Sequence, residues 1–202
     1  DLPAPLTTPQ PDYLHQFLQL CVQQGIEYVV MEVAAQALSL HRVQGIAFDG
    51  IIFTNFSHEH LEFYANLEDY FSAKKSIFSY AKSGAPLLIN ADDNACQELI
   101  ARQHNATTFG MQKTADINGS SISVPEGLYI QGFACAQPFT LHNSCLMGGF
   151  NVYNILAALG MAFKLGITIE TIEQALTAFA GVPGRLERYS LKNGASCIID
   201  YA

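Results

Sequence analysis

Two histidines and two glutamates stand close together in the stretch FTNFSHEHLEFY. The stretch follows the apolar run FDGII, which is typical of a buried β-strand. His58 and His60 are two residues apart, so in an extended segment their side chains share one side. Position 62 is Glu, so the stretch is not the HExxH motif of zinc peptidases. Its residue types predict a metal or acid–base site at a strand end, and an exposed polar loop is the plainer alternative.

Two further ionisable side chains stand in apolar surroundings. Glu32 follows the run YVVM, where a buried carboxylate costs several kcal/mol unless a donor or a cation meets it. Lys74 interrupts the apolar stripe of a predicted helix over 67–82, so its amine either reaches solvent or meets an anion in a cleft. The alternative to a functional role is that the Glu32 carboxylate bonds nearby backbone groups and that the Lys74 amine reaches solvent.

Amide, guanidinium and carboxylate side chains near the C-terminal end are suited to a nucleotide. GGFNVYN (148–154) precedes a predicted helix and places Asn151 and Asn154 on its first turn, where they cap the helix or face a nucleobase. Arg185 follows a turn and is free to bind phosphate oxygens, and Asp200 ends a predicted strand, where an acid often bonds ribose hydroxyls. A GxxxxGK[ST] phosphate loop is absent, since the sequence contains no Gly-Lys pair.

The charge balance excludes binding that depends on a basic surface. The net charge is −8, and the 202 residues include only ten Lys and Arg. No basic stripe exists to neutralise nucleic acid or an anionic membrane, so any anionic ligand must be held by a few local cations. Charged residues make up only 14% of the chain, which indicates surface that other segments normally cover and a piece of a larger protein.

Cysteine usage and hydropathy indicate a cytoplasmic location. The five cysteines are odd in number, widely spaced and without CxxC, so we expect buried thiols rather than disulfides or a zinc site. No apolar run is long enough for a membrane span, and no signal peptide is recognisable.

Alternating patterns predict an α/β fold: one domain over 1–202, with a mostly parallel sheet, flanking helices and a small antiparallel edge segment at about 107–147. Continuous apolar runs predict strands at 27–33, 48–55 and 86–90, and a last strand at CIIDYA. Helical periodicity predicts helices at 14–22, 67–82, 152–165 and 169–179. A further helix is expected through Leu99 and Ile100, with Asp92 or Asp93 as its cap. Glu32, Asn55 and Asp200 then fall at carboxyl ends of strands, where ligands of such sheets collect.

Several motifs, in order, resemble the central domain of the Mur ligases, and most closely their MurE-type branch, the UDP-N-acetylmuramoyl-tripeptide synthetases. The resemblance extends from Thr7 to Ala202. The motifs are TTP, MEVAAQAL with HR after it, FTNFSHEHLEFY, YFSAKK, INADD, GGFNVYN, PGRLER and a terminal DYA.

The resemblance implies roles for individual residues. Glu32 and His60 match magnesium-binding positions, and Lys74, rather than Lys75, matches a lysine that becomes a carbamate and helps to hold magnesium. The positions that hold the UDP-muramoyl-peptide are matched by Thr7, Thr8, Ala34, Leu40 and Arg42. The positions around ATP are matched by Asn55, Asn151, Asn154, Arg185 and Asp200.

The implied reaction is ATP-dependent addition of diaminopimelate or lysine to UDP-N-acetylmuramoyl-L-Ala-D-Glu in peptidoglycan synthesis, a pathway of cell-wall biogenesis, cell shape and cell division. An acyl phosphate forms first and the incoming amine then attacks it. Because the family's phosphate loop and its N- and C-terminal domains are missing from this sequence, we expect the isolated chain to be inactive.

Some residues depart from the family pattern and keep alternatives open. After MEV the family has SSH, where this sequence has AAQ, and a family glutamine is replaced by Leu40. The family's FNVSN is FNVYN in this sequence, and its DHLDYH is EHLEFY. Losing substrate-side hydroxyl and amide groups removes about 1–3 kcal/mol of binding if nothing compensates. A degenerate binding or assembly module, a related ligase such as folylpolyglutamate synthetase, and a metallohydrolase using His58 and His60 are the alternatives.

Overall fold

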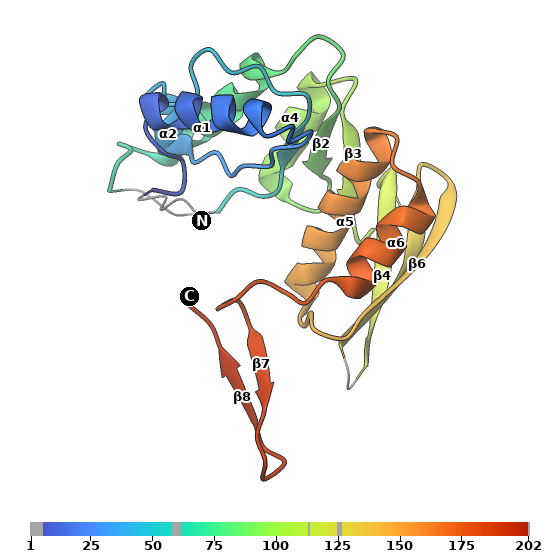
Figure 1. Ribbon diagram of the computed structural model, residues 1–202. Coiled ribbons are helices and arrows are strands. Elements are labelled where there is room, and N and C mark those ends of the chain that lie inside the picture. The colour runs from blue at the N-terminus through green and yellow to red at the C-terminus, as the bar shows by residue number, and fades with distance from the viewer. Residues whose placement is uncertain (1–5, 58–61, 113, 125–126, 202) are drawn as a thin grey trace. The chain divides into compact units, whose positions relative to one another are not determined.

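The chain forms two compact units in a computed structural model, which describes residues 6–57, 62–112, 114–124 and 127–201 (Figure 1). The first unit comprises Asp1–Ile51 and Phe56–Ala85, and the second comprises Ile52–Asn55 and Pro86–Ala202. No helix in the described part of the chain has the length and apolar character that a membrane crossing requires.

Helices and extended connections build the first unit. Leu14, Leu38 and Val43 are buried at its centre, and partly buried side chains such as Ile77 pack around them. The predicted helices at 14–22 and 67–82 are confirmed, although the second changes to a 3-10 helix in its last turns. The elements are α1 (Pro11–Gln23), α2 (Ala35–Ser39), α3 (Leu67–Lys75) and the 3-10 helix η1 (Ser76–Tyr80).

The predicted strand at 27–33 is wrong. This segment has no regular secondary structure, and Val30 is 95% exposed. Met31 and Val33 nevertheless pack against the core of the first unit, so alternate residues face inward as in a strand. A strand needs a neighbour to complete its hydrogen-bond ladder, and the described residues provide none for this segment.

A six-stranded sheet in the order β1-β2-β3-β4-β5-β6 dominates the second unit. Strand β2 runs parallel to β3 and β3 parallel to β4, whereas β4, β5 and β6 form an antiparallel meander. This confirms the α/β class with an antiparallel edge, but β3 belongs to the parallel part and not to the predicted antiparallel segment. The strands are β1 (Ile51–Phe53), β2 (Leu87–Asn90), β3 (Thr107–Gly110), β4 (Ile117–Val124), β5 (Gly127–Ala134) and β6 (Gln137–Asn143).

Two long helices pack on the sheet of the second unit, namely α5 (Gly149–Lys164) and α6 (Ile169–Ala178) (Figure 1). Their buried side chains, such as Leu156 and Ile172, share one core with those of the strands. Gly166 has a φ of 88° just beyond α5, and Thr168 caps α6 by accepting a hydrogen bond from the Thr171 backbone amide. Both helices are confirmed predictions.

Asp93 is the predicted cap at the end of β2. It accepts a 2.9 Å hydrogen bond from the Ala95 backbone amide. This bond begins the 3-10 helix η2 (Asn94–Cys96), which continues directly into α4 (Gln97–Arg102). The alternative that the sequence left open between Asp92 and Asp93 is thereby decided in favour of Asp93 for capping.

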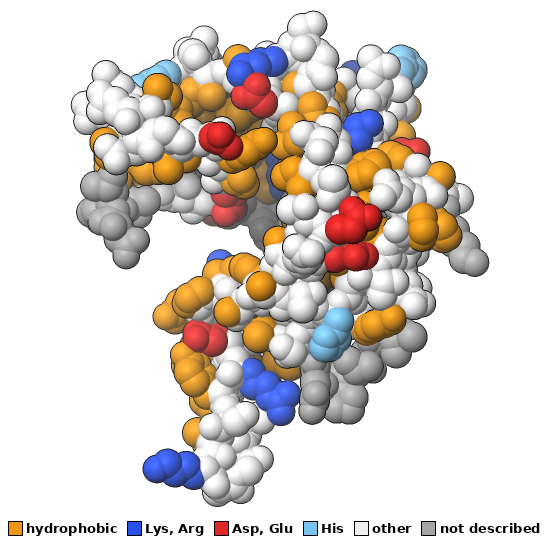
Figure 2. Space-filling view, turned by 45° about the vertical axis from the view of Figure 1, so that its right-hand side comes forward, with side chains coloured by type: hydrophobic (Ala, Val, Ile, Leu, Met, Phe, Trp, Pro, Cys, Tyr) orange, Lys and Arg blue, Asp and Glu red, His pale blue; other side chains and the backbone are white. Residues whose placement is uncertain are grey.

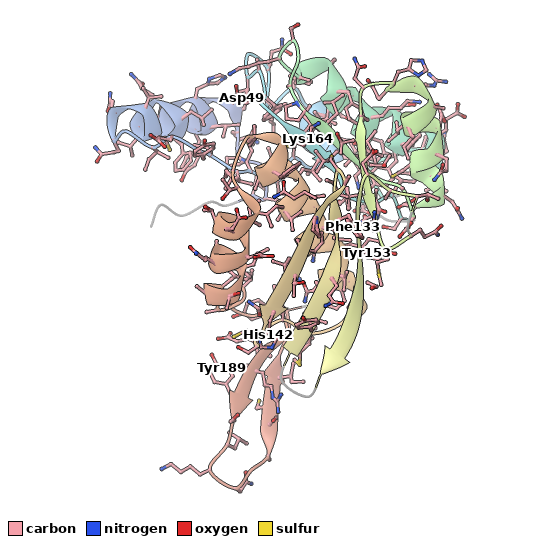
Figure 3. All side chains as sticks on the ribbon, turned by 90° about the vertical axis from the view of Figure 1, so that its right-hand side faces the viewer. Asp49, Phe133, His142, Tyr153, Lys164 and Tyr189 are labelled. Carbon is pink, nitrogen blue, oxygen red and sulfur yellow. The ribbon has the colours of Figure 1, made fainter. Side chains whose placement is uncertain are left out.

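The last elements are β7 (Glu187–Ser190) and β8 (Ser196–Ile199), which form an antiparallel hairpin. Figure 2 shows hydrophobic side chains at its surface, and Figure 3 labels Tyr189 on β7 and His142 on β6. Every residue of β8 is exposed, and no hairpin residue belongs to either hydrophobic core described above. The terminal strand is confirmed.

The predicted burial of the cysteines is mostly wrong. All five are free thiols, as expected, but only Cys96 is buried. Cys135, Cys145 and Cys197 are exposed. Two of them lie in turns that follow β5 and β6, and the third lies on the exposed hairpin, so the apolar character of a thiol does not by itself predict its burial.

Candidate functional site

Thr8 connects three other residues of the first unit, Glu32, Ala34 and Arg42, through hydrogen bonds. Its hydroxyl donates a 2.9 Å hydrogen bond to the Glu32 carbonyl and accepts a 3.0 Å bond from the Ala34 backbone amide. The Thr8 carbonyl in turn accepts a 3.1 Å bond from Nη1 of Arg42. Thr8 is 1% exposed and Arg42 is 9% exposed. Segments that are more than twenty residues apart in sequence are therefore joined through one buried threonine.

Arg42 has unused hydrogen-bonding capacity. Its Nε is buried and has no hydrogen-bond partner among the described residues. A buried guanidinium is costly unless its donors are satisfied, and carboxylate or phosphate groups satisfy them best. The structure thus brings Thr8, Ala34 and Arg42 together, because Thr8 bonds both of the others. The guanidinium of Arg42 is the cation of this group and is suited to an anionic ligand. Thr7 and Leu40, the other two residues predicted to bind substrate, are exposed.

The residues predicted to bind metal are only partly described. The Glu32 side chain is exposed while its backbone carbonyl is fixed by Thr8. Lys74 is half-buried in the last turn of α3, with Nζ 5.9 Å from the centroid of the Tyr70 ring. His58 and His60 lie outside the described residues. Within the described part of the chain, no three His, Cys, Asp or Glu side chains are grouped as metal ligands.

Lys74 and its neighbour Lys75 face different aromatic rings. Lys75 Nζ lies 5.1 Å from the centroid of the Phe71 ring. Phe56 packs on both Tyr70 and Phe71, with ring centroids 4.8 Å apart in each pair. Of the two residues that the lysines approach, Tyr70 is buried and Phe71 only half-buried. The more enclosed ring is therefore the one beside Lys74.

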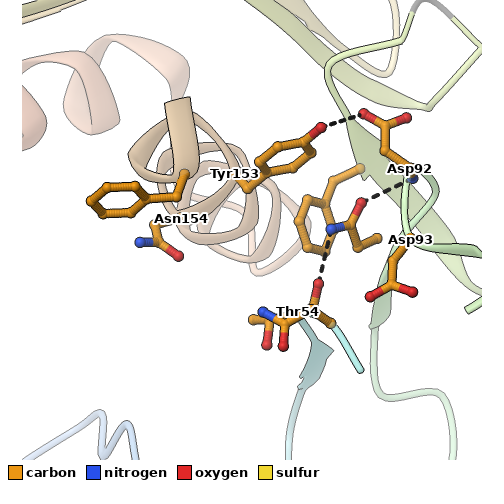
Figure 4. Close-up of a pocket in the computed structure, with 9 residues that line it drawn as sticks. Thr54, Asp92, Asp93, Tyr153 and Asn154 are labelled. Atoms are coloured by element: carbon orange, nitrogen blue, oxygen red, sulfur yellow. Dashed lines mark hydrogen bonds between the residues drawn. The ribbon is translucent and has the colours of Figure 1, made fainter. Parts of the chain in front are cut away.

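The second unit contains a pocket of about 550 Å³ at the carboxyl ends of β1, β2 and β3 and the first turns of α5 (Figure 4). This is the edge where ligands of parallel sheets collect. The side chains around it are amides, carboxylates, a hydroxyl and aromatic rings. The lining residues are Thr54, Asn55, Asn90, Asp92, Asp93, Phe109, Phe150, Tyr153 and Asn154.

A chain of hydrogen bonds fixes one side of this pocket (Figure 4). Asn90 Nδ2 donates to the Thr54 carbonyl at 2.9 Å, and Asn90 Oδ1 accepts from the Asp92 backbone amide at 2.9 Å. Asp92 Oδ2 accepts from the Met111 backbone amide at 2.6 Å and from the Tyr153 hydroxyl at 3.1 Å. The ends of β1, β2 and β3 are thereby connected to α5.

The Tyr153 phenol is held in its neutral form. Burial raises its pKa above the ordinary value, and the hydrogen bond to Asp92 and the charge of that carboxylate raise it further. A neutral phenol keeps the proton that it donates to Asp92. The pocket therefore has a tyrosine side chain with a fixed hydroxyl and an uncharged ring.

Only some of the residues predicted to bind nucleotide meet at this pocket. Asn55 and Asn154 line it. Asn151 is not among the lining residues; its amide donates to the Met147 carbonyl at 2.7 Å, and its Oδ1 accepts from Asn154 at 3.1 Å. The Arg185 side chain is exposed, and Asp200 accepts a 3.1 Å bond from the Leu186 amide beside the terminal hairpin.

The sequence reasoning assigned no ligand-binding role to Asp92, Tyr153 or Asn90. A signal for Tyr153 exists, because Phe150, Tyr153 and Asn154 are spaced i, i+3, i+4 and so share one face of α5. The signal for Asn90 and Asp92 is weaker. It is their position directly at the end of a buried strand, where the sequence analysis considered helix capping only.

A helix-flanked sheet with a polar pocket at the carboxyl ends of its parallel strands defines the ligand-binding class of α/β proteins. The family description "Mur ligase middle domain" matches residues 2–162. The chain belongs to this family.

Curated relatives agree with the family assignment. The UDP-N-acetylmuramoyl-L-alanyl-D-glutamate–2,6-diaminopimelate ligase of Gloeobacter violaceus is 38% identical over 200 residues, which cover 97% of this chain and 40% of that protein. The ligase of the same name from Bacillus cereus is 36% identical over 206 residues, with 97% and 41% covered. The chain thus spans about 40% of the length of these relatives.

Solved structures show the same fold. A UDP-N-acetylmuramoyl-L-alanyl-D-glutamate–2,6-diaminopimelate ligase superposes with a TM-score of 0.76 at 26% identity, covering 88% of this chain and 37% of that one. The MurF ligase of Thermotoga maritima, solved in complex with ADP, has a TM-score of 0.67 at 22% identity, covering 87% and 42%. The second similarity concerns the fold alone.

Proposed function

We propose that the full-length gene product is an ATP-dependent carboxylate–amine ligase of peptidoglycan synthesis in the cytoplasm. It would add diaminopimelate to UDP-N-acetylmuramoyl-L-Ala-D-Glu. The observation that carries the proposal is the 38% identity over 97% of the chain to a relative named as the diaminopimelate ligase. Lysine is the alternative third amino acid, and the relatives named above favour diaminopimelate.

The reaction proceeds in two chemical steps. The terminal carboxylate of the UDP-linked dipeptide attacks the γ-phosphorus of ATP, which releases ADP and forms an acyl phosphate. The amine of diaminopimelate then attacks the acyl carbon, loses a proton and expels phosphate from a tetrahedral intermediate. Both steps develop negative charge on oxygen atoms, so cationic groups must be available nearby.

Each polar region of the chain suits one part of this reaction. The amide-rich pocket with Asn55 and Asn154 suits ATP, with Asn151, Arg185 and Asp200 as further ATP-contacting candidates. Arg42, whose buried Nε has no partner among the described residues and whose Nη1 bonds the Thr8 carbonyl, suits an anionic group of the UDP-muramoyl-peptide. Thr7, Ala34 and Leu40 complete that substrate site in the proposal. The Ala34 backbone stays anchored by Thr8 although no serine hydroxyl is present.

The three ligand types proposed for the metal, a carboxylate, an imidazole and a carbamate, suit Mg²⁺. Magnesium prefers one or two protein carboxylates and completes its coordination with substrate phosphates and water. Glu32 supplies an exposed carboxylate on an anchored backbone. His60 and a carbamate on Lys74 would be the other ligands, and the ion, when bound, would neutralise charge on the phosphates. The carbamate would form by addition of carbon dioxide to the Lys74 amine, which is half-buried and lies beside the Tyr70 ring.

The test is phosphate release by the full-length gene product. The assay contains ATP, Mg²⁺ and UDP-N-acetylmuramoyl-L-Ala-D-Glu, with diaminopimelate, with lysine or without an amino acid. We expect release that depends on diaminopimelate. A protein that binds the substrates and releases no phosphate under any of these conditions would be a binding module instead.

The Arg42→Met variant tests the substrate side. Removing the guanidinium should raise the KM for the UDP-linked dipeptide about tenfold or more, because a charge-assisted hydrogen bond contributes about 1.5–3 kcal/mol. Arg102→Met is the matched control, since Arg102 is an exposed residue paired with Glu98 at 3.0 Å on α4. Equal KM values in both variants would contradict the assignment of Arg42.

A further inference from the structure

The described residues that line the pocket of the second unit include no cation that could bind phosphates. Its lining residues include the two carboxylates of Asp92 and Asp93 and neither Lys nor Arg. Phosphate groups would be repelled there, whereas amides and aromatic rings suit the flat, polar edge and the π-face of a nucleobase. The nucleobase, and not the phosphates, is therefore the part of a nucleotide that fits this pocket.

Three aromatic rings line the pocket, and they differ in how they are held. Phe109 is completely buried in the core of the sheet, and Phe150 is 55% exposed. Tyr153 is half-buried and its hydroxyl is bonded to Asp92 at 3.1 Å. Its ring is thus presented to the pocket and fixed at its far end (Figure 4).

Asp92 is itself tightly held. Besides its hydrogen bonds to Asn90 and Met111, it packs against Gly110, where an added Cβ would lie 2.8 Å from Asp92 Oδ1. A Cβ there would force the carboxylate to shift, so the absence of a side chain at Gly110 leaves the space that Asp92 occupies. The carboxylate that orients Tyr153 therefore has little freedom to move.

We propose that the Tyr153 ring is the surface on which the nucleobase of ATP stacks, and that Asp92 is the positioning residue that holds this ring in place. The inference rests on the proposed nucleotide-dependent function and adds a base-binding residue to it. Tyr153 stands at the position where the resembled motif FNVSN has serine, so the stacking surface is a feature of this chain's own sequence.

The experiment measures binding of ATP and of inorganic tripolyphosphate to the full-length gene product by titration calorimetry. The variants are Tyr153→Leu, which keeps the bulk and removes the aromatic ring, and Tyr153→Phe, which keeps the ring and removes its hydrogen bond. Tyr129→Leu is the matched control. Tyr129 is a half-buried tyrosine on β5 whose hydroxyl accepts a 3.2 Å bond from Gln131 outside the pocket.

We expect Tyr153→Leu to weaken ATP binding about tenfold, because stacking of a base on an aromatic ring contributes about 1–3 kcal/mol. Tyr153→Phe should weaken it about threefold through loss of the fixed orientation. Tripolyphosphate binding should stay unchanged in both Tyr153 variants, and Tyr129→Leu should bind ATP as the wild type does.

The outcomes separate this inference from the proposed function. Failure of the wild-type protein to bind ATP would overturn the proposed function and the inference with it. Wild-type ATP affinity in Tyr153→Leu would overturn the inference alone. An equal loss of ATP and tripolyphosphate binding would also overturn it, because the ring would then support the pocket without contacting the base.

Discussion

The Thr8 hydroxyl connects two backbone groups of the segment around Val33. It donates to the Glu32 carbonyl and accepts from the Ala34 amide. Replacement by valine keeps the shape of the side chain and leaves both groups without this partner. Buried polar groups that lose a partner cost about 1–3 kcal/mol each relative to bonded ones.

Both bonds are only part-buried, so water compensates for part of the loss. We therefore expect Thr8→Val to lower the free energy of unfolding by about 1–3 kcal/mol in total, measured by urea denaturation. Thr8→Ser retains the hydroxyl and should stay within about 1 kcal/mol of the wild type. If the valine variant is as stable as the serine variant, the threonine does not organise this segment as described.

The pairing of Tyr153 with Asp92 shows where residue-level prediction ends. The two residues are 61 positions apart, and nothing in their local patterns connects them. The sequence did indicate Asn154 and Asn55, because amides at strand ends and helix starts are local signals. The partner of a side chain depends instead on which strands the fold places side by side, and Asp92 meets Tyr153 only because α5 packs beside the end of β2 (Figure 4).

At the scale of elements, periodicity predicted the helices well and the strands less evenly. Helix α5 has an apolar face and a glycine beyond its end, and both signals are local. The segment 27–33 has the composition of a buried strand but no partner in the described residues. A segment forms a β-strand only when an adjacent strand pairs with it, so an apolar run alone could not predict one here.

Gly160 determines how closely α5 approaches the sheet. A Cβ added there would lie 2.7 Å from Leu88 Cδ2 and 3.2 Å from Ile117 Cγ1, and both of those residues are completely buried. Helix propensity alone favours alanine over glycine by about 1 kcal/mol. Because neither neighbour has free space to move into, overpacking should outweigh this preference.

We expect Gly160→Ala to lower the free energy of unfolding by about 1–2 kcal/mol, measured by urea denaturation. Gly149→Ala is the matched control in the same helix, since an added Cβ there has no heavy atom within 4 Å. That variant should change stability by less than about 0.5 kcal/mol. A stabilised Gly160→Ala protein would show that α5 can move away from β2 at little cost.

At the scale of the whole molecule, the distribution of charge limits what this chain can do by itself. The sequence has a net charge of −8 and no GxxxxGK[ST] loop, and the described pocket is lined by two carboxylates without a cation. Transfer of the γ-phosphoryl group depends on backbone amides, a lysine and metal ions placed around the phosphates. In the proposed division of roles these residues form the base pocket and contribute to the magnesium site, but the sequence lacks the phosphate-binding loop that the transfer requires.

We therefore expect the 202-residue chain, purified by itself, to release no phosphate from ATP above the rate in buffer, even with Mg²⁺ and both other substrates present. Circular dichroism must show helical content in the same sample, so that inactivity is not mistaken for unfolding. The full-length gene product should release phosphate under identical conditions. Turnover of ATP by the isolated chain would mean that the terminal cations, including Arg185, can replace a phosphate loop, and the proposed division of roles between the pocket and the rest of the enzyme would be wrong.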